Sequence, residues 1–178
     1  MKRTHLYGLL FLGCGGGALF SITVRESAET VVEKGTLLED VVGQVGFGDL
    51  LNLDITSSQE LQNQGVAPGD IQQVYLSDFT LTATDPPDAD LAFLESVEVY
   101  VSAPDLPEVM IASASGFPEG VAEVAFDLED VDLTDYAISA SMSLRTDVTG
   151  RRPDADTTIV ADVALDVGVT AQGVCNNL

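Results

Sequence analysis

LAFLESVEVYVSAPDLPEVMIA, residues 91–112, contains two runs of alternating apolar and polar residues on either side of a proline-containing break. Apolar and polar residues alternate through Val97–Ser102, which is the period of a strand with one buried face. Pro104 and Pro107 interrupt the pattern, because proline fixes φ and lacks an amide hydrogen. Alternation resumes after the second proline. The stretch therefore predicts an interior strand, a rigid exposed connection and a second strand.

The same alternation recurs along the rest of the chain. A first edge strand is predicted over residues 20–32. Further strands are predicted over residues 51–55, 74–83, 122–128, 138–144 and 159–169. Within 74–83 the apolar parity switches between Leu76 and Phe79, which predicts a β-bulge near Ser77 and Asp78. About seven to nine short strands at this spacing favour an all-β fold, an antiparallel β-sandwich of general immunoglobulin-like architecture.

Two capping boxes predict short helices before the main run of strands. Thr36 and Glu39 have capping-box spacing, and apolar residues at helical intervals extend the pattern over 38–45. Ser57 and Glu60 repeat the spacing. They predict a two-turn helix over 58–64, which Gly65 ends.

Acidic residues dominate the 178-residue chain, with 29 Asp and Glu against 7 Lys and Arg and a formal net charge of −22. This excess repels phosphates and anionic head groups, so nucleic acid is excluded as a partner and cationic, metallic or neutral partners are expected. A solubilising coat is the preferred explanation of the charge. Hydrophobic residues make up 46% of the chain, which is enough for the core of one domain. The sequence identifies no protein or glycan partner.

The N-terminus has the order of charge and hydropathy that marks an export signal. The basic pair Lys2 and Arg3 precedes the apolar run Leu6–Leu12, and small residues follow. This run is too short and too rich in glycine to span a bilayer as a helix. We therefore expect an exported protein.

Gly13 and Cys14 at the end of this run resemble the lipobox of bacterial lipoproteins, in which the cysteine is acylated and becomes the new N-terminus. Phe11 departs from the usual leucine, which leaves open a plain secretory signal cut near Ala18 that removes Cys14. In lipoproteins Asp after the cysteine marks inner-membrane retention, so Gly15 implies the outer membrane. The resemblance implies a signal peptide over 1–13, a glycine-rich tether over 14–20 and a β-sandwich domain over 21–178.

Two further segments resemble uncharacterised bacterial secreted lipoproteins with a single all-β domain. One lies within residues 93–112 and includes Ser96–Ala103 and Leu106–Val109; the other is the C-terminal Val167–Asn176. The resemblance covers most of the chain after the signal segment. It implies an all-β, surface-exposed domain tethered to the membrane by its N-terminal lipid, and it supplies no activity and no site residues.

The chain beyond the signal segment lacks the side chains that most catalytic mechanisms use. His5, the only histidine, lies in the signal segment, which excludes Ser-His-Asp triads, Cys-His dyads and His-ligated zinc from the mature chain. Lys34 is the only lysine beyond that segment. Carboxylate-only catalysis, such as glycoside hydrolysis, remains by elimination as a minor alternative. No catalytic residue is predicted, and we expect a non-catalytic binding or structural role.

Acidic turns supply the metal-binding hypothesis. Asp85, Asp88 and Asp90 share one loop, and Asp154 and Asp156 share another, at alternate positions that suit the oxygen ligands of Ca²⁺. The preferred alternative is that aspartate and proline make good turns. Both loops contain PDAD, at 87–90 and 153–156, which we interpret as two similar turns rather than a repeat. No cofactor other than Ca²⁺ is expected.

The remaining chemically distinctive residues are three arginines and one thiol. The arginines are expected to balance the negative charge of nearby Asp147 and Asp154; they are Arg145, Arg151 and Arg152. The alternative is that they mark a contact with an anionic partner. Cys175 is expected to be a buried structural residue. One alternative is a disulfide bond to Cys14, which acylation of Cys14 would exclude. The other is a free thiol that forms a disulfide with a second molecule.

Overall fold

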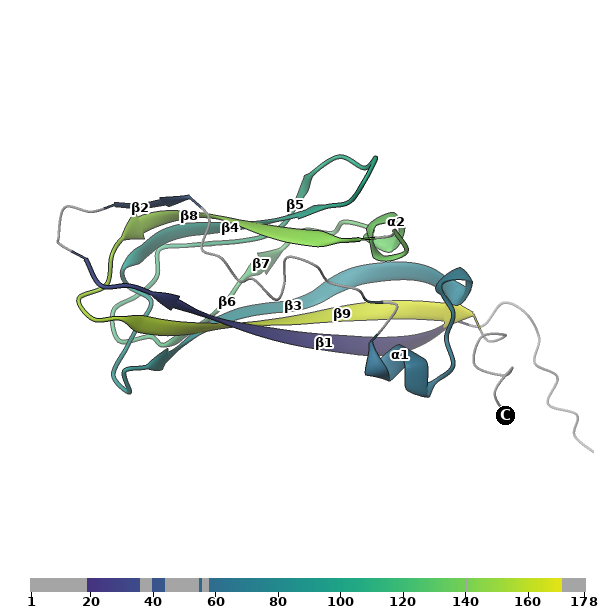
Figure 1. The fold of residues 1–178 in the computed structure, drawn as a ribbon, viewed down its shortest axis with the longest axis horizontal. Helices are drawn as coiled ribbons and strands as arrows, with labels where there is room; N and C mark the ends of the chain where they lie inside the picture. Colours follow the sequence, from purple (N-terminus) through teal and green to yellow (C-terminus); the bar gives the residue numbers. More distant parts are fainter. Residues whose placement is uncertain (1–18, 36–39, 44–54, 56–57, 140, 171–178) are drawn as a thin grey trace, which may run out of the picture.

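The computed structural model describes residues 19–35, 40–43, 55, 58–139 and 141–170, and within them nine strands form a two-sheet antiparallel β-sandwich (Figure 1). The strands are β1 (Leu19–Val32), β2 (Asp40–Gly43), β3 (Ile71–Asp85), β4 (Leu94–Ser102), β5 (Val109–Ser115), β6 (Glu123–Ala125), β7 (Asp127–Leu128), β8 (Ser143–Arg151) and β9 (Thr157–Thr170). Short helices α1 (Gln59–Asn63) and α2 (Thr134–Ala137) and the 3₁₀ turn η3 (Pro68–Asp70) complete the described elements. The predicted fold class is confirmed.

One sheet has the strand order β1-β9-β3-β6 and the other β2-β8-β4-β5-β7. β3, with 15 residues, is the longest described strand, and it pairs with the 14-residue β9 along nearly its whole length. Side chains from both inner faces meet in one core, because each strand turns alternate residues inward. Neither described helix has the length and apolar character that a bilayer-spanning helix needs.

The stretch at residues 91–112 forms the hairpin β4–β5, and β4 is the central strand of its sheet. Val97, Val99 and Val101 are at most 1% exposed, so the predicted interior strand is confirmed. The connection that contains the two prolines is largely exposed, and the Tyr136 hydroxyl donates a hydrogen bond to the Pro107 carbonyl at 2.7 Å. This hydroxyl fastens the connection to α2.

The predicted bulge lies in β3. The register of β3 on β9 shifts between Leu76 and Asp78, and both Leu76 and Phe79 are buried. One extra residue in β3 therefore turns both apolar sets toward the core, as the change in parity predicted. The first strand is also confirmed, since β1 lies at a sheet edge and pairs with β9.

The C-terminal half departs from prediction in two places. The strand predicted over 122–128 is divided: β6 pairs with β3 in one sheet, and β7 pairs with β5 in the other. Buried Phe126 lies between them, where the chain crosses the sandwich. The strand predicted over 138–144 is wrong at its start, because Ile138 ends α2 and is 43% exposed, and β8 begins only at Ser143.

Of the two predicted helices, the second is confirmed. The Ser58 hydroxyl accepts a hydrogen bond from the Leu61 amide at the start of α1, and Gly65 has a φ of 65° just beyond its end. The helix over 38–45 is wrong where it is described, since residues 40–43 form β2 on the edge of β8. β-branched valines in this segment favour a strand once a partner is available.

Several predictions fall on residues outside the described ranges. They include the signal segment, Cys14, Cys175 and most of the strand predicted over 51–55. Ile55 itself is described, and it is buried in a 3₁₀ turn rather than paired in a strand.

Candidate functional site

The two PDAD turns lie side by side at one end of the sandwich. Residues 86–93 carry the chain from β3 in one sheet to β4 in the other, and residues 152–156 carry it from β8 to β9. Because β3 pairs with β9 and β4 pairs with β8, the two connections are neighbours. The repeated tetrapeptide therefore marks two crossovers that run between the sheets in opposite directions.

A cleft of about 300 Å³ lies between the two crossovers. Asp88, Asp90 and Asp154, three of the five aspartates predicted as calcium ligands, line it. Asp85 ends β3, and neither it nor Asp156 belongs to the cleft wall. The fold thus brings the two predicted loops together, although it does not direct all five carboxylates to one place.

Two of these carboxylates hold backbone amides. Asp90 Oδ1 accepts a hydrogen bond from the Ala92 amide at 3.1 Å, and its Oδ2 accepts one from the Gly120 amide at 2.6 Å. Asp156 Oδ1 accepts a bond from the Lys34 amide at 2.9 Å. Asp90 therefore ties its own turn to the neighbouring turn that contains Gly120, which is a structural role.

Metal coordination finds little support in this geometry. Within the described ranges, no group of three His, Cys, Asp or Glu side chains is placed to hold a metal ion. Calcium usually takes about six to eight oxygen ligands. Arg151 and Arg152 also line the cleft, and their positive charges oppose a cation there. Turn formation, the preferred explanation, accounts for the observed contacts of Asp90 and Asp156.

The two arginines at the cleft are held by backbone contacts. The Arg151 amide donates a hydrogen bond to the Phe93 carbonyl at 2.8 Å, which joins the last residue of β8 to the end of the first crossover. Arg152 Nη1 donates to the Glu33 carbonyl at 3.4 Å, just beyond the end of β1. These contacts fix the backbone of the cleft, while the side chain of Arg151 is exposed.

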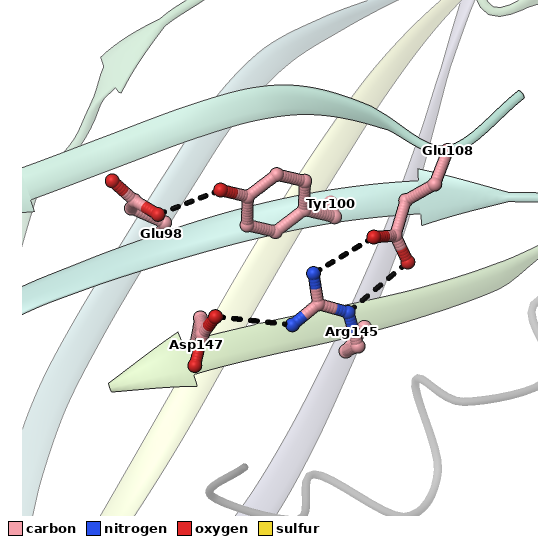
Figure 2. A network of polar contacts seen from close by, with 5 residues as sticks. All are labelled: Glu98, Tyr100, Glu108, Arg145 and Asp147. Atoms are coloured by element: carbon pink, nitrogen blue, oxygen red, sulfur yellow. Dashed lines mark hydrogen bonds and ion pairs between the residues drawn. The ribbon is translucent and has the colours of Figure 1, made fainter. Parts of the chain in front are cut away.

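The densest network of charged side chains lies elsewhere, on the outer face of the β4–β8 pair (Figure 2). Arg145 binds Glu108 through two hydrogen bonds, from Nε at 3.0 Å and from Nη2 at 2.8 Å. Its Nη1 lies 3.3 Å from Asp147 Oδ2, which confirms the expected pairing of these two residues. The guanidinium carbon is 4.4 Å from the centre of the Tyr100 ring, a cation–π contact.

Tyr100 extends the network to a third carboxylate. Its hydroxyl donates a hydrogen bond to Glu98 Oε2 at 2.6 Å, and this bond raises the pKa of Tyr100 above its usual value. The bidentate contact with Arg145 lowers the pKa of Glu108, and the same contact raises the pKa of Arg145. The carboxylates of Glu98, Glu108 and Asp147 are thus each hydrogen-bonded or ion-paired, and the network links β4, β8 and the connection before β5.

Sequence reasoning missed Glu108 and Tyr100 as partners of Arg145. Tyr100 lies directly opposite Arg145 in the β4–β8 register, and Glu108 reaches it from the connection before β5. The strand alternation places both Tyr100 and Arg145 on an outward face, but pairing two strands separated by more than 40 positions requires the sheet order. No local signal in the sequence identifies Glu108.

Known proteins offer few parallels. No family model matches the chain, and no curated protein matches it. Among solved structures it is similar to the crystal structure of a decameric BFDV capsid protein, with 6% sequence identity and a TM-score of 0.47 over 85% of this chain and 99% of that chain. No family assignment follows from these comparisons.

Proposed function

We propose that this chain is a lipid-anchored protein of the cell envelope whose β-sandwich has a non-catalytic binding or structural role. The observation that carries the proposal is the position of β1. It begins at Leu19, five positions after the lipobox cysteine, Cys14. Five residues span at most about 18 Å. An acyl group on that cysteine would therefore hold the sandwich close to the bilayer surface.

The engagement of the charged side chains favours a non-catalytic role. The carboxylates around Arg145 are bound within one network, and Asp90 is bound to two backbone amides. A general acid or base must exchange protons with a substrate at an accessible site. Side chains that are already committed to holding strands and turns are better suited to stabilising a surface than to turning over a substrate.

Replacing Cys14 by alanine is expected to move the protein from the membrane fraction to the soluble periplasmic or secreted fraction, or to leave an unprocessed precursor. Acylation needs the thiol, and several acyl chains on one residue give a stable anchor. Cys175→Ala is the matched control, because it removes the other thiol and leaves the lipobox intact. Mass spectrometry of the N-terminus reads the modification directly.

Unchanged membrane fractionation of the Cys14→Ala variant, with the same processed N-terminus, would overturn the lipid anchor. A mature parent N-terminus near Ala18 would also overturn it and establish the plain secretory signal instead.

A calcium-dependent binding module is the second candidate, because the fold brings Asp88, Asp90 and Asp154 into one cleft. Asp90→Ala is expected to lower the free energy of unfolding by about 1 kcal/mol in EDTA, since two amides lose their acceptor. Asp88→Ala, which removes an exposed carboxylate from the same cleft, is expected to leave it unchanged. Thermal melts of parent and variants in EDTA measure both effects.

The same melts in millimolar Ca²⁺ decide the second candidate. Bound calcium would raise the melting temperature of the parent by mass action, and Asp88→Ala would reduce the rise. A parent melting temperature that is identical in Ca²⁺ and EDTA would exclude the calcium module and leave Asp90 with its structural role alone.

A further inference from the structure

We propose that the edge strand β1 joins two copies of this chain by pairing antiparallel with β1 of a second copy, so that two four-stranded sheets become one continuous sheet. β1 runs for 14 residues along the edge of its sheet (Figure 1), and among the described residues it is hydrogen-bonded as a strand only to β9. Its other edge carries backbone donors and acceptors that a further strand can satisfy.

β1 lacks several of the features that protect exposed edges from pairing. The sequence Leu19–Val32 contains no proline, lysine or glycine, and its register on β9 is continuous, without a bulge. Val31, on the outward face, is 56% exposed. A long, regular and partly apolar edge of this kind is a template for another strand.

The charges on the outward face are self-complementary. Arg25 and Glu29 are both exposed and project to the side opposite buried Val24 and Ala28. Four residues apart on one strand, they are about 13 Å from each other and cannot pair within one copy. Neither forms an ion pair with another described residue. Each therefore has its charge available to a partner.

One register satisfies both charges. When Ser27 lies opposite the Ser27 of the second copy, Arg25 of each copy lies opposite Glu29 of the other, and residues 22–32 pair along their length. Opposite charges directly across a strand pair stabilise it. Exposed Glu26, which shares the parity of the inner face, then lies opposite Ala28. A shift of two residues toward the N-terminus would place Glu26 against Glu26, where like charges repel. The opposite shift would place Arg25 against Val31 and Glu29 against Ser27, which leaves both charges without a partner, so the charge pattern selects the first register.

The large negative charge of the chain makes this pairing depend on ionic strength. Two copies with a formal charge of −22 each repel at long range. At physiological ionic strength the Debye length is about 8 Å, so distant charges are screened while facing side chains still interact. The second copy is favoured over an unrelated strand because this register matches Arg25 and Glu29 of one copy to the same two residues of the other.

Charge exchange tests the pairing. The full chain and its variants are purified in the same mild detergent, and light scattering measures the mass of the complex at micromolar concentrations. We expect the parent to be dimeric. Arg25→Glu or Glu29→Arg alone opposes like charges at two positions and is expected to weaken dimerisation about tenfold or more. An equimolar mixture of these two variants restores opposite charges and is expected to form a heterodimer.

Glu123→Arg is the matched control for Glu29→Arg, because it makes the same change of charge at an exposed glutamate on β6, at the opposite edge of the same sheet, and it is expected to leave dimerisation unchanged. A monomeric parent would overturn the proposal, whether or not another protein binds the edge. It would also be overturned if both single variants dimerised as well as the parent, or if their mixture showed no heterodimer while each variant kept the parent's melting temperature.

Discussion

Phe79→Ala is expected to lower the free energy of unfolding by about 4 kcal/mol, the largest effect of any single substitution proposed for this protein. Phe79 is 1% exposed, at the point where β3 resumes after its bulge. Its ring centroid lies 4.8 Å from that of Phe126, with the rings inclined at 55°. Truncation removes this contact and leaves a cavity where the chain crosses between the sheets.

The loss is large against the stability of a single domain, which is about 5–15 kcal/mol in total. Urea unfolding followed by circular dichroism measures it as a lower midpoint with an unchanged slope. Phe20→Ala is the matched control, since Phe20 is 49% exposed and its truncation is expected to change the free energy of unfolding by no more than about 0.5 kcal/mol. Equal effects of the two substitutions would contradict the assigned core.

Gly150→Ala is expected to cost about 2–3 kcal/mol, because β4 and β8 approach too closely there for a side chain. A Cβ at this position would lie 2.5 Å from the Phe93 carbonyl oxygen and 2.9 Å from Leu94 Cα. Both atoms belong to the backbone, and the adjacent bond from the Arg151 amide to Phe93 holds them in place. Relief of the clash requires the two strands to separate at the cleft.

Gly168→Ala is the matched control in β9. A Cβ there would also come within 2.5 Å of another atom, but that atom is Cγ of the exposed Gln73 side chain. A flexible side chain can rotate away, so we expect a change of no more than about 1 kcal/mol in the free energy of unfolding. The two variants together separate a backbone clash from a side-chain clash. A Gly150→Ala protein as stable as Gly168→Ala would show that β4 and β8 are not in this close register.

The elements that were predicted correctly are those whose residues alternate, or are capped, within a single segment of the sequence. The hairpin at 91–112, the bulge in β3 and the long strands β1 and β9 each follow from apolar residues within one segment. α1 follows from a local cap and a terminal glycine. These signals need no knowledge of the partner strand, because the choice of buried face is already made by each strand's own alternation.

The candidate site was predicted only in part, and for a consistent reason. The acidic loops were identified from their residues, but their meeting in one cleft depends on the pairing of β3 with β9 and of β4 with β8. The contact of Arg145 with Asp147 is local in sequence, whereas its stronger contact with Glu108 joins residues 37 positions apart. When two side chains meet only because of the order of strands in a sheet, no local pattern in the sequence predicts their contact.

The β-sandwich and most of its core could be predicted from the amino-acid sequence, because strand alternation and capping are properties of single segments. Ile138 is an exception, since the alternation over 138–144 placed it inward and it is exposed. Only the pairing of distant segments shows that residues 40–43 form β2 rather than a helix and that residues 122–128 divide between the two sheets. The physical reason is that backbone hydrogen bonds in a sheet join distant segments, so the partner, rather than the segment alone, decides where each strand begins, ends and lies.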